Sequence, residues 1–286
     1  MADRLAGADL PAPRGGGRPL SRRRGPERLP GLVDSHAHLQ HASFDADRDE
    51  VIARAVDAGL ERILVPGWDI ASSEAALELA ARHPGVVDAA VGIHPHDAAS
   101  MDEPAWARLE ALIADPRARA VGEIGLDHFR SLSPHDAQRE VFDRQLALAA
   151  DRGLPVLVHD RDAHDEVIDA LLAWAGRAGQ PARGVLHAFS GDAAMAERLG
   201  GEGVLVSFAL PVAFGSAVGP RAAATALAAG SFLVETDSPY LGPDREARNE
   251  PTTVLRVVAE LARLRGEDVV HLVAPIREAY RSLVGA

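Results

Sequence analysis

Residues 33–39, VDSHAHL, decide the fold because they join an apolar run typical of a β-strand to two histidines two positions apart. Residues i and i+2 of a strand share one face, so His36 and His38 are expected to point the same way. Two imidazoles on one face are able to bind a single metal ion, whereas a chance pairing would leave two ordinary histidines. The rest of the sequence discriminates between these two interpretations.

Seven further apolar or β-branched runs follow, separated by longer segments rich in Ala, Leu and Arg. The eight runs are residues 32–39, 62–67, 87–96, 118–127, 154–160, 183–189, 203–208 and 231–237. Strands that are apolar throughout and alternate with helices predict an α/β fold with a covered parallel sheet. Eight such units in residues 31–286 match the size of a (β/α)8 TIM barrel, about 250 residues. The competitor is an open doubly wound sheet, which usually has a glycine-rich first loop where this chain has histidines.

The helical segments carry the expected signals at their ends. Residues 47–58 and 162–175 show apolar stripes at helical spacing. Ser133 followed by Pro134 predicts a cap with proline in the first helical position, and Gly153 predicts the end of that helix.

Composition excludes several classes of protein. The 286 residues carry a formal net charge of -12, which disfavours a broad basic track for duplex DNA. The chain has no cysteine and no lysine, so thiolate catalysis, a Walker-type phosphate loop and a Schiff-base lysine are excluded. No apolar run is long enough to span a membrane. We therefore expect a cytoplasmic protein.

The first 30 residues differ from the rest. Residues 1–30 are rich in Arg, Pro and Gly and lack the apolar core of a secretory signal. We expect a disordered basic arm here, followed by the barrel domain over residues 31–286. The Arg22-Arg23-Arg24 cluster leaves open that this arm attracts nucleic acid.

Metal-binding side chains interrupt most of the runs near their C-terminal ends. These are His36 and His38 in the first run, Glu123 in the fourth, His159 in the fifth, His187 in the sixth and Asp237 in the eighth. A lone histidine at a strand end is usually structural, but the C-terminal strand ends of a TIM barrel form one functional face. Six ligands are too many for one catalytic ion with an open position and suit two divalent ions, Mg, Mn or Zn, bridged by a carboxylate. Glu123 is the natural bridge in a chain without lysine.

Six stretches occur in an order that is specific to one family: DSHAHL, GIHPH, VGEIGLD, QREVFDRQLALAADRGLPVLVH, GVLHAFSG and ETDSPYL followed by RNEP. With these motifs the chain resembles the TatD-type metal-dependent deoxyribonucleases of the amidohydrolase superfamily. The resemblance implies a phosphodiesterase that trims DNA with two divalent ions. It implies that His36, His38, Glu123 and Asp237 hold one ion and that Glu123, His159 and His187 hold the other. Asp237 would also orient or deprotonate the attacking water, so Asp237 and Glu123 are the expected catalytic pair.

Further residues are expected around this centre. His94, Arg161 and Arg130 are candidates for binding phosphate, and Glu235 shares a face with Asp237 as a supporting residue. His96 is expected in a loop. The remaining histidines without strand-end placement are expected on the surface: His41, His83, His135, His164 and His271.

The sequence departs from the family pattern in places that concern substrate preference. His128-Phe129 replaces an aromatic pair, and Asp160 replaces the serine that usually follows the fifth-strand histidine. The glycine often found after the seventh strand is missing, and the C-terminal helix lacks its usual asparagine.

Two alternatives remain open at this stage. One is a metal-dependent hydrolase of another ester or amide, such as an aminoacyl-tRNA ester, on the same scaffold. The other is a non-catalytic nucleic-acid-binding protein, which would not need six metal ligands. We expect a DNA exonuclease that prefers ends or single strands, acting as a monomer without a stable protein partner and without a membrane.

Overall fold

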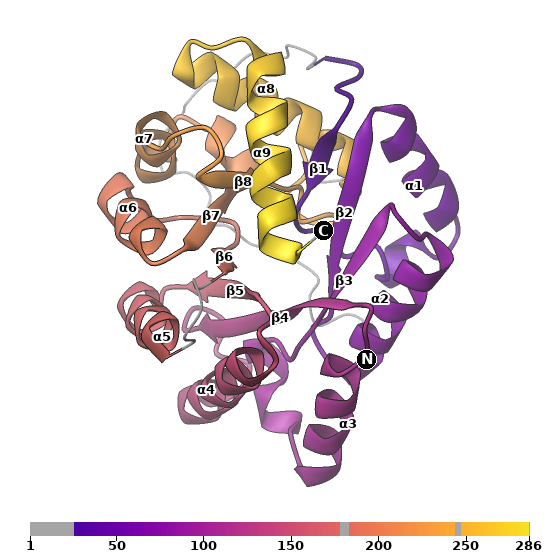
Figure 1. Cartoon of the computed structure of the whole chain (residues 1–286), viewed down its shortest axis with the longest axis vertical. Coiled ribbons are helices and arrows are strands. Elements are labelled where there is room, and N and C mark those ends of the chain that lie inside the picture. The colour runs from indigo at the N-terminus through magenta and orange to yellow at the C-terminus, as the bar shows by residue number, and fades with distance from the viewer. Residues whose placement is uncertain (1–25, 178–182, 244–246, 286) are drawn as a thin grey trace.

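The computed structural model describes residues 26–177, 183–243 and 247–285. Eight parallel strands follow one another in chain order around a barrel, with helices on the outside (Figure 1). The strands are β1 (Leu32–Asp34), β2 (Leu60–Pro66), β3 (Val87–Val91), β4 (Ala118–Asp127), β5 (Val156–Arg161), β6 (Gly184–Leu186), β7 (Val204–Phe208) and β8 (Phe232–Val234). The predicted TIM barrel is confirmed.

The helices lie between the strands and after the last one. They are α1 (Arg48–Asp57), α2 (Ile70–Arg82), α3 (Glu103–Ile113), α4 (His135–Arg152), α5 (His164–Arg177), α6 (Ala193–Gly201), α7 (Val218–Ala226), α8 (Val254–Arg265) and α9 (Val269–Val284). Aspartate side chains cap α2, α3 and α6 by accepting a backbone N–H of the first turn. Gly153 ends α4 in the left-handed conformation, as predicted.

The helix start at Ser133-Pro134 differs from the prediction. The helix α4 begins at His135, and Pro134 stands before its first turn without a side-chain cap. The Ser133 hydroxyl instead donates to the carbonyl of His96 and accepts from the N–H of Ala99. It therefore ties the β4–α4 loop to the β3–α3 loop.

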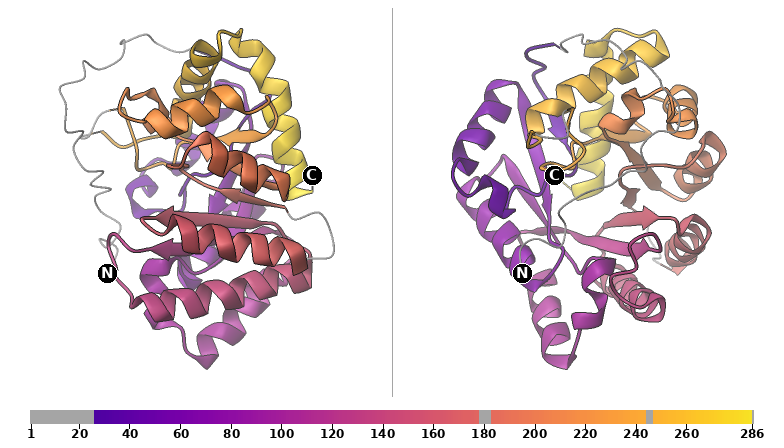
Figure 2. Two further views of the ribbon diagram at one scale, coloured as in Figure 1. Left: turned by 90° about the vertical axis from the view of Figure 1, so that its left-hand side faces the viewer. Right: turned by 180° about the vertical axis from the view of Figure 1, so that it is seen from behind.

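The barrel closes between β1 and β8. The N–H of Ser35 donates to the carbonyl of Val234, and Ala37 and Ser238 form an isolated parallel bridge. The predicted strand 32–39 is therefore shorter, although its pairing continues irregularly. Helix α9 packs against both edge strands on the outside, as two further views show (Figure 2).

The core consists of inward-facing strand residues and the inner faces of the helices. Leu32, Ile63 and Phe232 are examples of side chains that are fully buried. Leu29 is also buried, and its N–H donates to the carbonyl of Ala58, so packed structure begins before residue 31. The proposed arm lies largely outside the described residues, since residues 1–25 are not among them. No helix in the described ranges is long and apolar enough to cross a membrane.

Candidate metal centre

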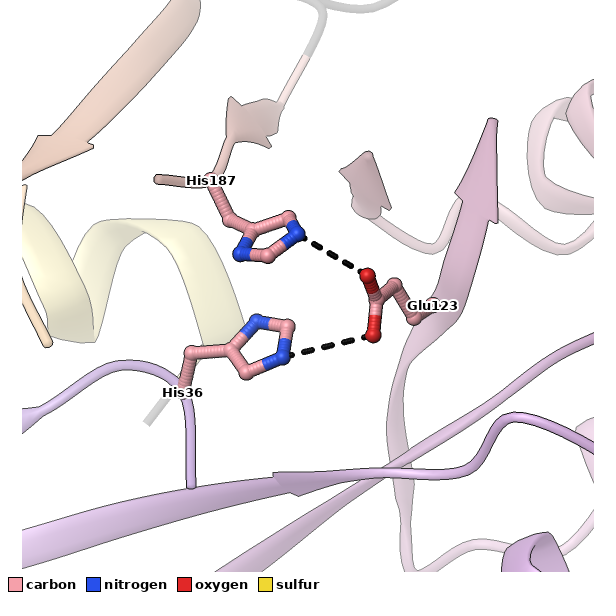
Figure 3. A group of neighbouring side chains, drawn as sticks. All are labelled: His36, Glu123 and His187. Carbon is pink, nitrogen blue, oxygen red and sulfur yellow. Dashed lines mark ion pairs between the residues drawn. The ribbon is translucent and has the colours of Figure 1, made fainter. Parts of the chain in front are cut away.

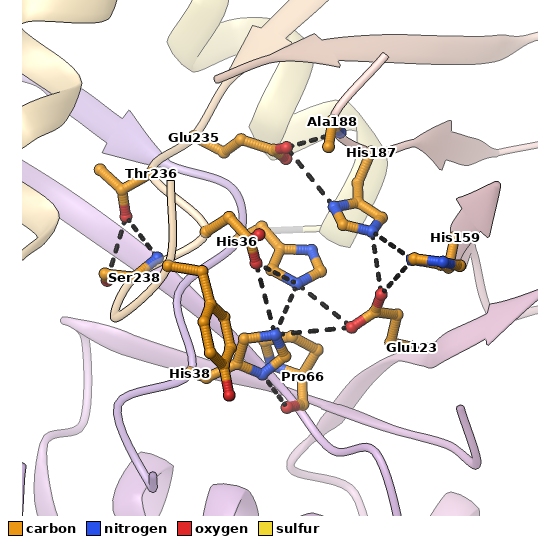
Figure 4. A network of polar contacts seen from close by, with 12 residues as sticks. His36, His38, Pro66, Glu123, His159, His187, Ala188, Glu235, Thr236 and Ser238 are labelled. Atoms are coloured by element: carbon orange, nitrogen blue, oxygen red, sulfur yellow. Dashed lines mark hydrogen bonds and ion pairs between the residues drawn. The ribbon is translucent and has the colours of Figure 1, made fainter. Parts of the chain in front are cut away.

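The six predicted ligands lie close together toward the C-terminal ends of the strands. Figure 4 shows five of them: His36, His38, Glu123, His159 and His187. His36 and His38 follow β1, Glu123 lies within β4, and His159 lies within β5. His187 follows β6, and Asp237 follows β8. Parallel strands bring these residues to one face although they are far apart in the chain.

The first group of donor atoms gathers around Oε2 of Glu123. The Nε2 atoms of His36 and His38 are 3.1 Å apart, and they lie 3.4 Å and 3.5 Å from this oxygen. Oδ1 of Asp237 is 3.6 Å from Nε2 of His36 and 3.5 Å from Nε2 of His38. The two imidazoles therefore point at a common centre, as their spacing of two residues predicts.

The second group gathers around the other oxygen of Glu123. Oε1 lies 2.9 Å from Nε2 of His187, 3.1 Å from Nδ1 of His159 and 3.4 Å from Nε2 of His94. Figure 3 shows the carboxylate of Glu123 reaching His187 with one oxygen and His36 with the other. Glu123 therefore has one oxygen in each group.

The spacing of the donors fits metal binding. Ligand atoms at about 2.1 Å from a tetrahedral zinc ion stand about 3.4 Å from one another. The Nε2 atoms of His36 and His38 lie 3.1 Å from each other and 3.4–3.6 Å from Oε2 of Glu123 and Oδ1 of Asp237. Imidazole and carboxylate together suit divalent transition metals.

Electrostatics favour ionised carboxylates in this cluster. Burial favours protonation of Glu123, but the imidazole of His187 holds its pKa well below its usual value. Burial likewise opposes ionisation of Asp237, but the contact with His38 lowers its pKa. Burial lowers the pKa of His94 to about 3, so its imidazole is neutral; its Nδ1 accepts the N–H of His96, which leaves the ring proton on Nε2, the nitrogen that faces Glu123.

Comparison with known proteins decides the family. The family model described as TatD related DNase matches residues 33–285. The chain belongs to the TatD family.

Relatives and solved structures agree with this assignment. The chain is 37% identical over 236 residues to the uncharacterized metal-dependent hydrolase YabD of Bacillus subtilis (strain 168), covering 82% of this chain and 91% of that protein. It is 35% identical over 250 residues to the 3'-5' ssDNA/RNA exonuclease TatD of Cronobacter sakazakii (strain ATCC BAA-894), covering 85% and 94%. The crystal structure of YJJV, a TatD homolog from Escherichia coli K12, gives a TM-score of 0.82 at 28% identity and covers 89% and 98%. The chain is thus a TatD-type metal-dependent hydrolase that acts on ester bonds, as its motifs predict.

Two supporting acids stand behind the histidines of this TatD centre. Oε1 of Glu235 lies 3.5 Å from Nδ1 of His187 and accepts the N–H of Ala188 at 2.6 Å. Asp127 supports a different ligand: its Oδ2 is 3.3 Å from Nε2 of His159 and 2.8 Å from Nε2 of His96. Carboxylates in these positions orient metal-binding imidazoles.

Sequence reasoning missed Asp127 and misplaced His96. The prediction placed His96 in a loop, but its side chain is buried against Asp127 within a short 3-10 helix, Pro95–Ser100. Asp127 ends β4 and is 1% exposed. The available signal was its position as a polar residue at the end of an apolar strand, the same signal that singled out Glu123.

A pocket of about 510 Å³ opens above the centre. Both predicted phosphate-binding arginines, Arg130 and Arg161, line it. His94 lines the same pocket, but it stands among the donors of the second group rather than at the mouth.

The other histidines have varied surroundings. His135 and His271 are exposed, as expected. His83 and His164 are half-buried, each beside an aspartate, Asp49 and Asp160. His41 is also half-buried, and its ring lies 6.2 Å from that of Trp68 and 5.9 Å from that of Tyr240. His41, His83 and His164 are therefore more buried than the surface positions that the sequence predicted for them.

Proposed function

We propose that this TatD protein is an exonuclease that hydrolyses phosphodiester bonds at the ends of single-stranded DNA or RNA. The observation that carries the proposal is the position of Glu123: its two carboxylate oxygens belong to separate donor groups at the floor of a pocket. The Cronobacter relative is named as a 3'-5' ssDNA/RNA exonuclease, which supports the substrate and the direction of digestion.

The donor groups support two divalent ions. His36, His38 and Asp237 would hold one ion with Oε2 of Glu123. His159 and His187 would hold the other with Oε1. When bound, such a pair lowers the pKa of a water molecule and neutralises charge on the phosphate oxygens.

Asp237 is the proposed general base. Its side chain is 14% exposed and lines the pocket, so it reaches both the first donor group and the space where a substrate would lie. Its lowered pKa keeps the carboxylate ionised and able to accept a proton from the attacking water. Its N–H donates to the carbonyl of His36, which fixes the base relative to that ligand.

Two arginines are proposed to hold the substrate phosphate. Arg130 follows β4 and Arg161 ends β5, so both stand on the side of the pocket next to the second donor group. A guanidinium offers paired N–H donors that match two phosphate oxygens. This favours a phosphodiester over the amide and carboxylic ester substrates of other hydrolases with a similar barrel.

The dimensions and charge of the pocket favour strand ends. A pocket of about 510 Å³ has the size of a small-molecule site, which fits a nucleotide at the end of one strand. The net charge of -12 gives little attraction for long duplex DNA.

A substrate panel tests the proposal. Protein reconstituted with Mn²⁺, Mg²⁺ or Zn²⁺ is assayed on linear single-stranded DNA, circular single-stranded DNA, blunt duplex DNA, RNA and an aminoacyl ester. We expect shortening of linear DNA and RNA from the 3' end, and no cutting of circles. The variant Glu123→Ala should lose the activity, whereas Glu166→Gln, a change at an exposed acid of α5, should retain it.

Faster hydrolysis of the aminoacyl ester than of any nucleic acid would overturn the proposed substrate. Cleavage that survives Glu123→Ala would overturn the role of the metal centre.

A further inference from the structure

Exposed hydrophobic side chains gather near the pocket. In the described ranges six large hydrophobic side chains are exposed: Val56, Phe129, Leu132, Phe214, Val218 and Val270. Four of these lie where loops leave the functional face, two between β4 and α4 and two between β7 and the first residue of α7. Among the four, only Phe129 and Val218 line the pocket.

Of the two exposed hydrophobic residues that line the pocket, Phe129 is the aromatic one. It is 48% exposed, so part of the ring is accessible from the pocket. The guanidinium of Arg161 stacks over its ring, with Cζ 4.2 Å from the ring centroid. This cation–π contact holds the ring in place at the mouth.

The strand register places this ring close to the chemistry. Asp127 of β4 pairs in register with Arg161 of β5, and Asp127 contacts the metal-binding His159. Phe129 lies two residues beyond Asp127 and Arg161 two residues beyond His159. Arg161 is the last residue of β5, and two residues of a strand span about 6.6 Å, so its backbone lies about that far beyond His159. Phe129 lies in the turn after β4 with its ring against the Arg161 guanidinium.

The pocket is lined by more acidic than basic side chains, so contacts that do not depend on charge would help it hold a nucleic-acid strand. Five acids line it: Glu123, Asp127, Asp160, Asp162 and Asp237. Its lining includes two cationic side chains, Arg130 and Arg161. A polyanionic strand meets limited attraction here beyond that of the metal centre, whereas stacking of bases on aromatic rings does not depend on charge.

We propose that the ring of Phe129, backed by Arg161, is a stacking platform for the nucleobase next to the phosphodiester bond at the metal centre. The inference rests on the proposed exonuclease function and adds a base-binding subsite to it. Stacking tolerates every base, because each base has a π-face. The platform therefore holds the end of a strand in position without selecting a sequence.

Abasic substrates separate this role from a general effect on the protein. Single-stranded DNA with normal nucleotides at its 3' end is compared with the same strand carrying abasic tetrahydrofuran residues at its last positions. Wild type and three variants are assayed: Phe129→Ala, Phe129→Tyr and Phe214→Ala. Phe214 is the matched control, since it is 46% exposed in a loop of the same face but does not line the pocket.

We expect Phe129→Ala to lower kcat/KM on the normal strand by about 5- to 150-fold, the range measured for loss of one stacked base. On the abasic strand wild type should already be slow, and Phe129→Ala should change it little. Phe129→Tyr should keep wild-type activity on the normal strand, and Phe214→Ala should match wild type on both strands.

A second measurement reads binding directly. The fluorescence of 2-aminopurine near the 3' end of a strand with phosphorothioate linkages should be quenched by wild type and by Phe129→Tyr, and much less by Phe129→Ala.

The outcomes distinguish this inference from the proposed function. Failure of wild type to cleave any nucleic acid would refute the function itself. If wild type cleaves, an equal loss on normal and abasic strands in Phe129→Ala, or no loss on either, would overturn the stacking platform. Quenching of 2-aminopurine that persists in Phe129→Ala would also overturn the stacking platform.

Discussion

Asp127 holds the outer nitrogen of His159: Oδ2 lies 3.3 Å from Nε2, while Nδ1 of the same ring lies 3.1 Å from Glu123. The carboxylate accepts a hydrogen bond from Nε2–H, which leaves the lone pair of the neutral ring on Nδ1, facing the second donor group. The ring is therefore oriented at both nitrogens by residues of β4, the neighbouring strand.

Replacing Asp127 by Asn should weaken metal binding. The amide keeps the size but turns an N–H₂ group or a weaker acceptor toward His159. We expect a 10- to 100-fold loss of metal affinity, as is typical when a carboxylate behind a metal-binding histidine is removed. Calorimetric titration with Mn²⁺ or Zn²⁺ measures it. Asp160→Asn is the control, because Asp160 contacts His164 and no ligand; equal losses in the two variants would refute the assigned role.

Metal binding should stabilise the fold in proportion to occupancy. A ligand present at 100 times its Kd adds about 2.7 kcal/mol to the free energy of unfolding. We expect EDTA-treated protein to melt at a lower temperature than protein with Mn²⁺ or Zn²⁺. The variant Glu123→Gln should show little of this increment, since both donor groups use Glu123. An undiminished increment in that variant would place the bound metal elsewhere.

The closure between β1 and β8 should depend on Asp34. This fully buried carboxylate accepts the N–H and hydroxyl of Thr236 and the N–H of His36. Asp34→Ala leaves these buried donors without an acceptor, at about 1–3 kcal/mol for each unsatisfied group. We expect urea unfolding to show a loss of about 3 kcal/mol, with a smaller loss in Asp34→Asn. A loss below about 0.5 kcal/mol, the range of a surface change, would contradict this.

The pair of His164 and Asp160 should stabilise the protein in acid more than in base. Their 2.6 Å contact raises the pKa of His164 above its ordinary value of 6.5. Its contribution is therefore fully present below that value and is lost as the pH rises through the raised pKa. Because the His164 side chain is 40% exposed, solvent screens the pair and limits its contribution to about 1 kcal/mol.

Thermal melts of wild type and His164→Gln test this pH dependence. The variant should be less stable at about pH 5.5 and nearly equal at about pH 9. The exposed His271→Gln should show no such difference. If the difference in melting temperature between wild type and His164→Gln stayed constant across this pH range, the contact of His164 with Asp160 would not contribute through protonation of His164.

Strand composition predicted some strands at both ends. The run 118–127 matches β4 from its first residue to its last, although the register with β3 and with β5 shifts once in each pairing. The run 32–39 exceeds β1 because the chain after Asp34 pairs with β8 through isolated bonds rather than a regular ladder. The side chains of residues i and i+2 still point the same way in this irregular stretch, so the rings of His36 and His38 converge as predicted.

The sequence by itself determined the order of strands and helices and the placement of six candidate metal ligands at or near the C-terminal ends of strands. These follow from local hydrophobic periodicity, which each segment carries without its neighbours. Only the tertiary structure decided that His94 stands beside Glu123, that Asp127 stands behind His159, and that Arg161 covers Phe129. Such contacts join residues on different strands at distances set by barrel closure and register, and no local pattern encodes those distances.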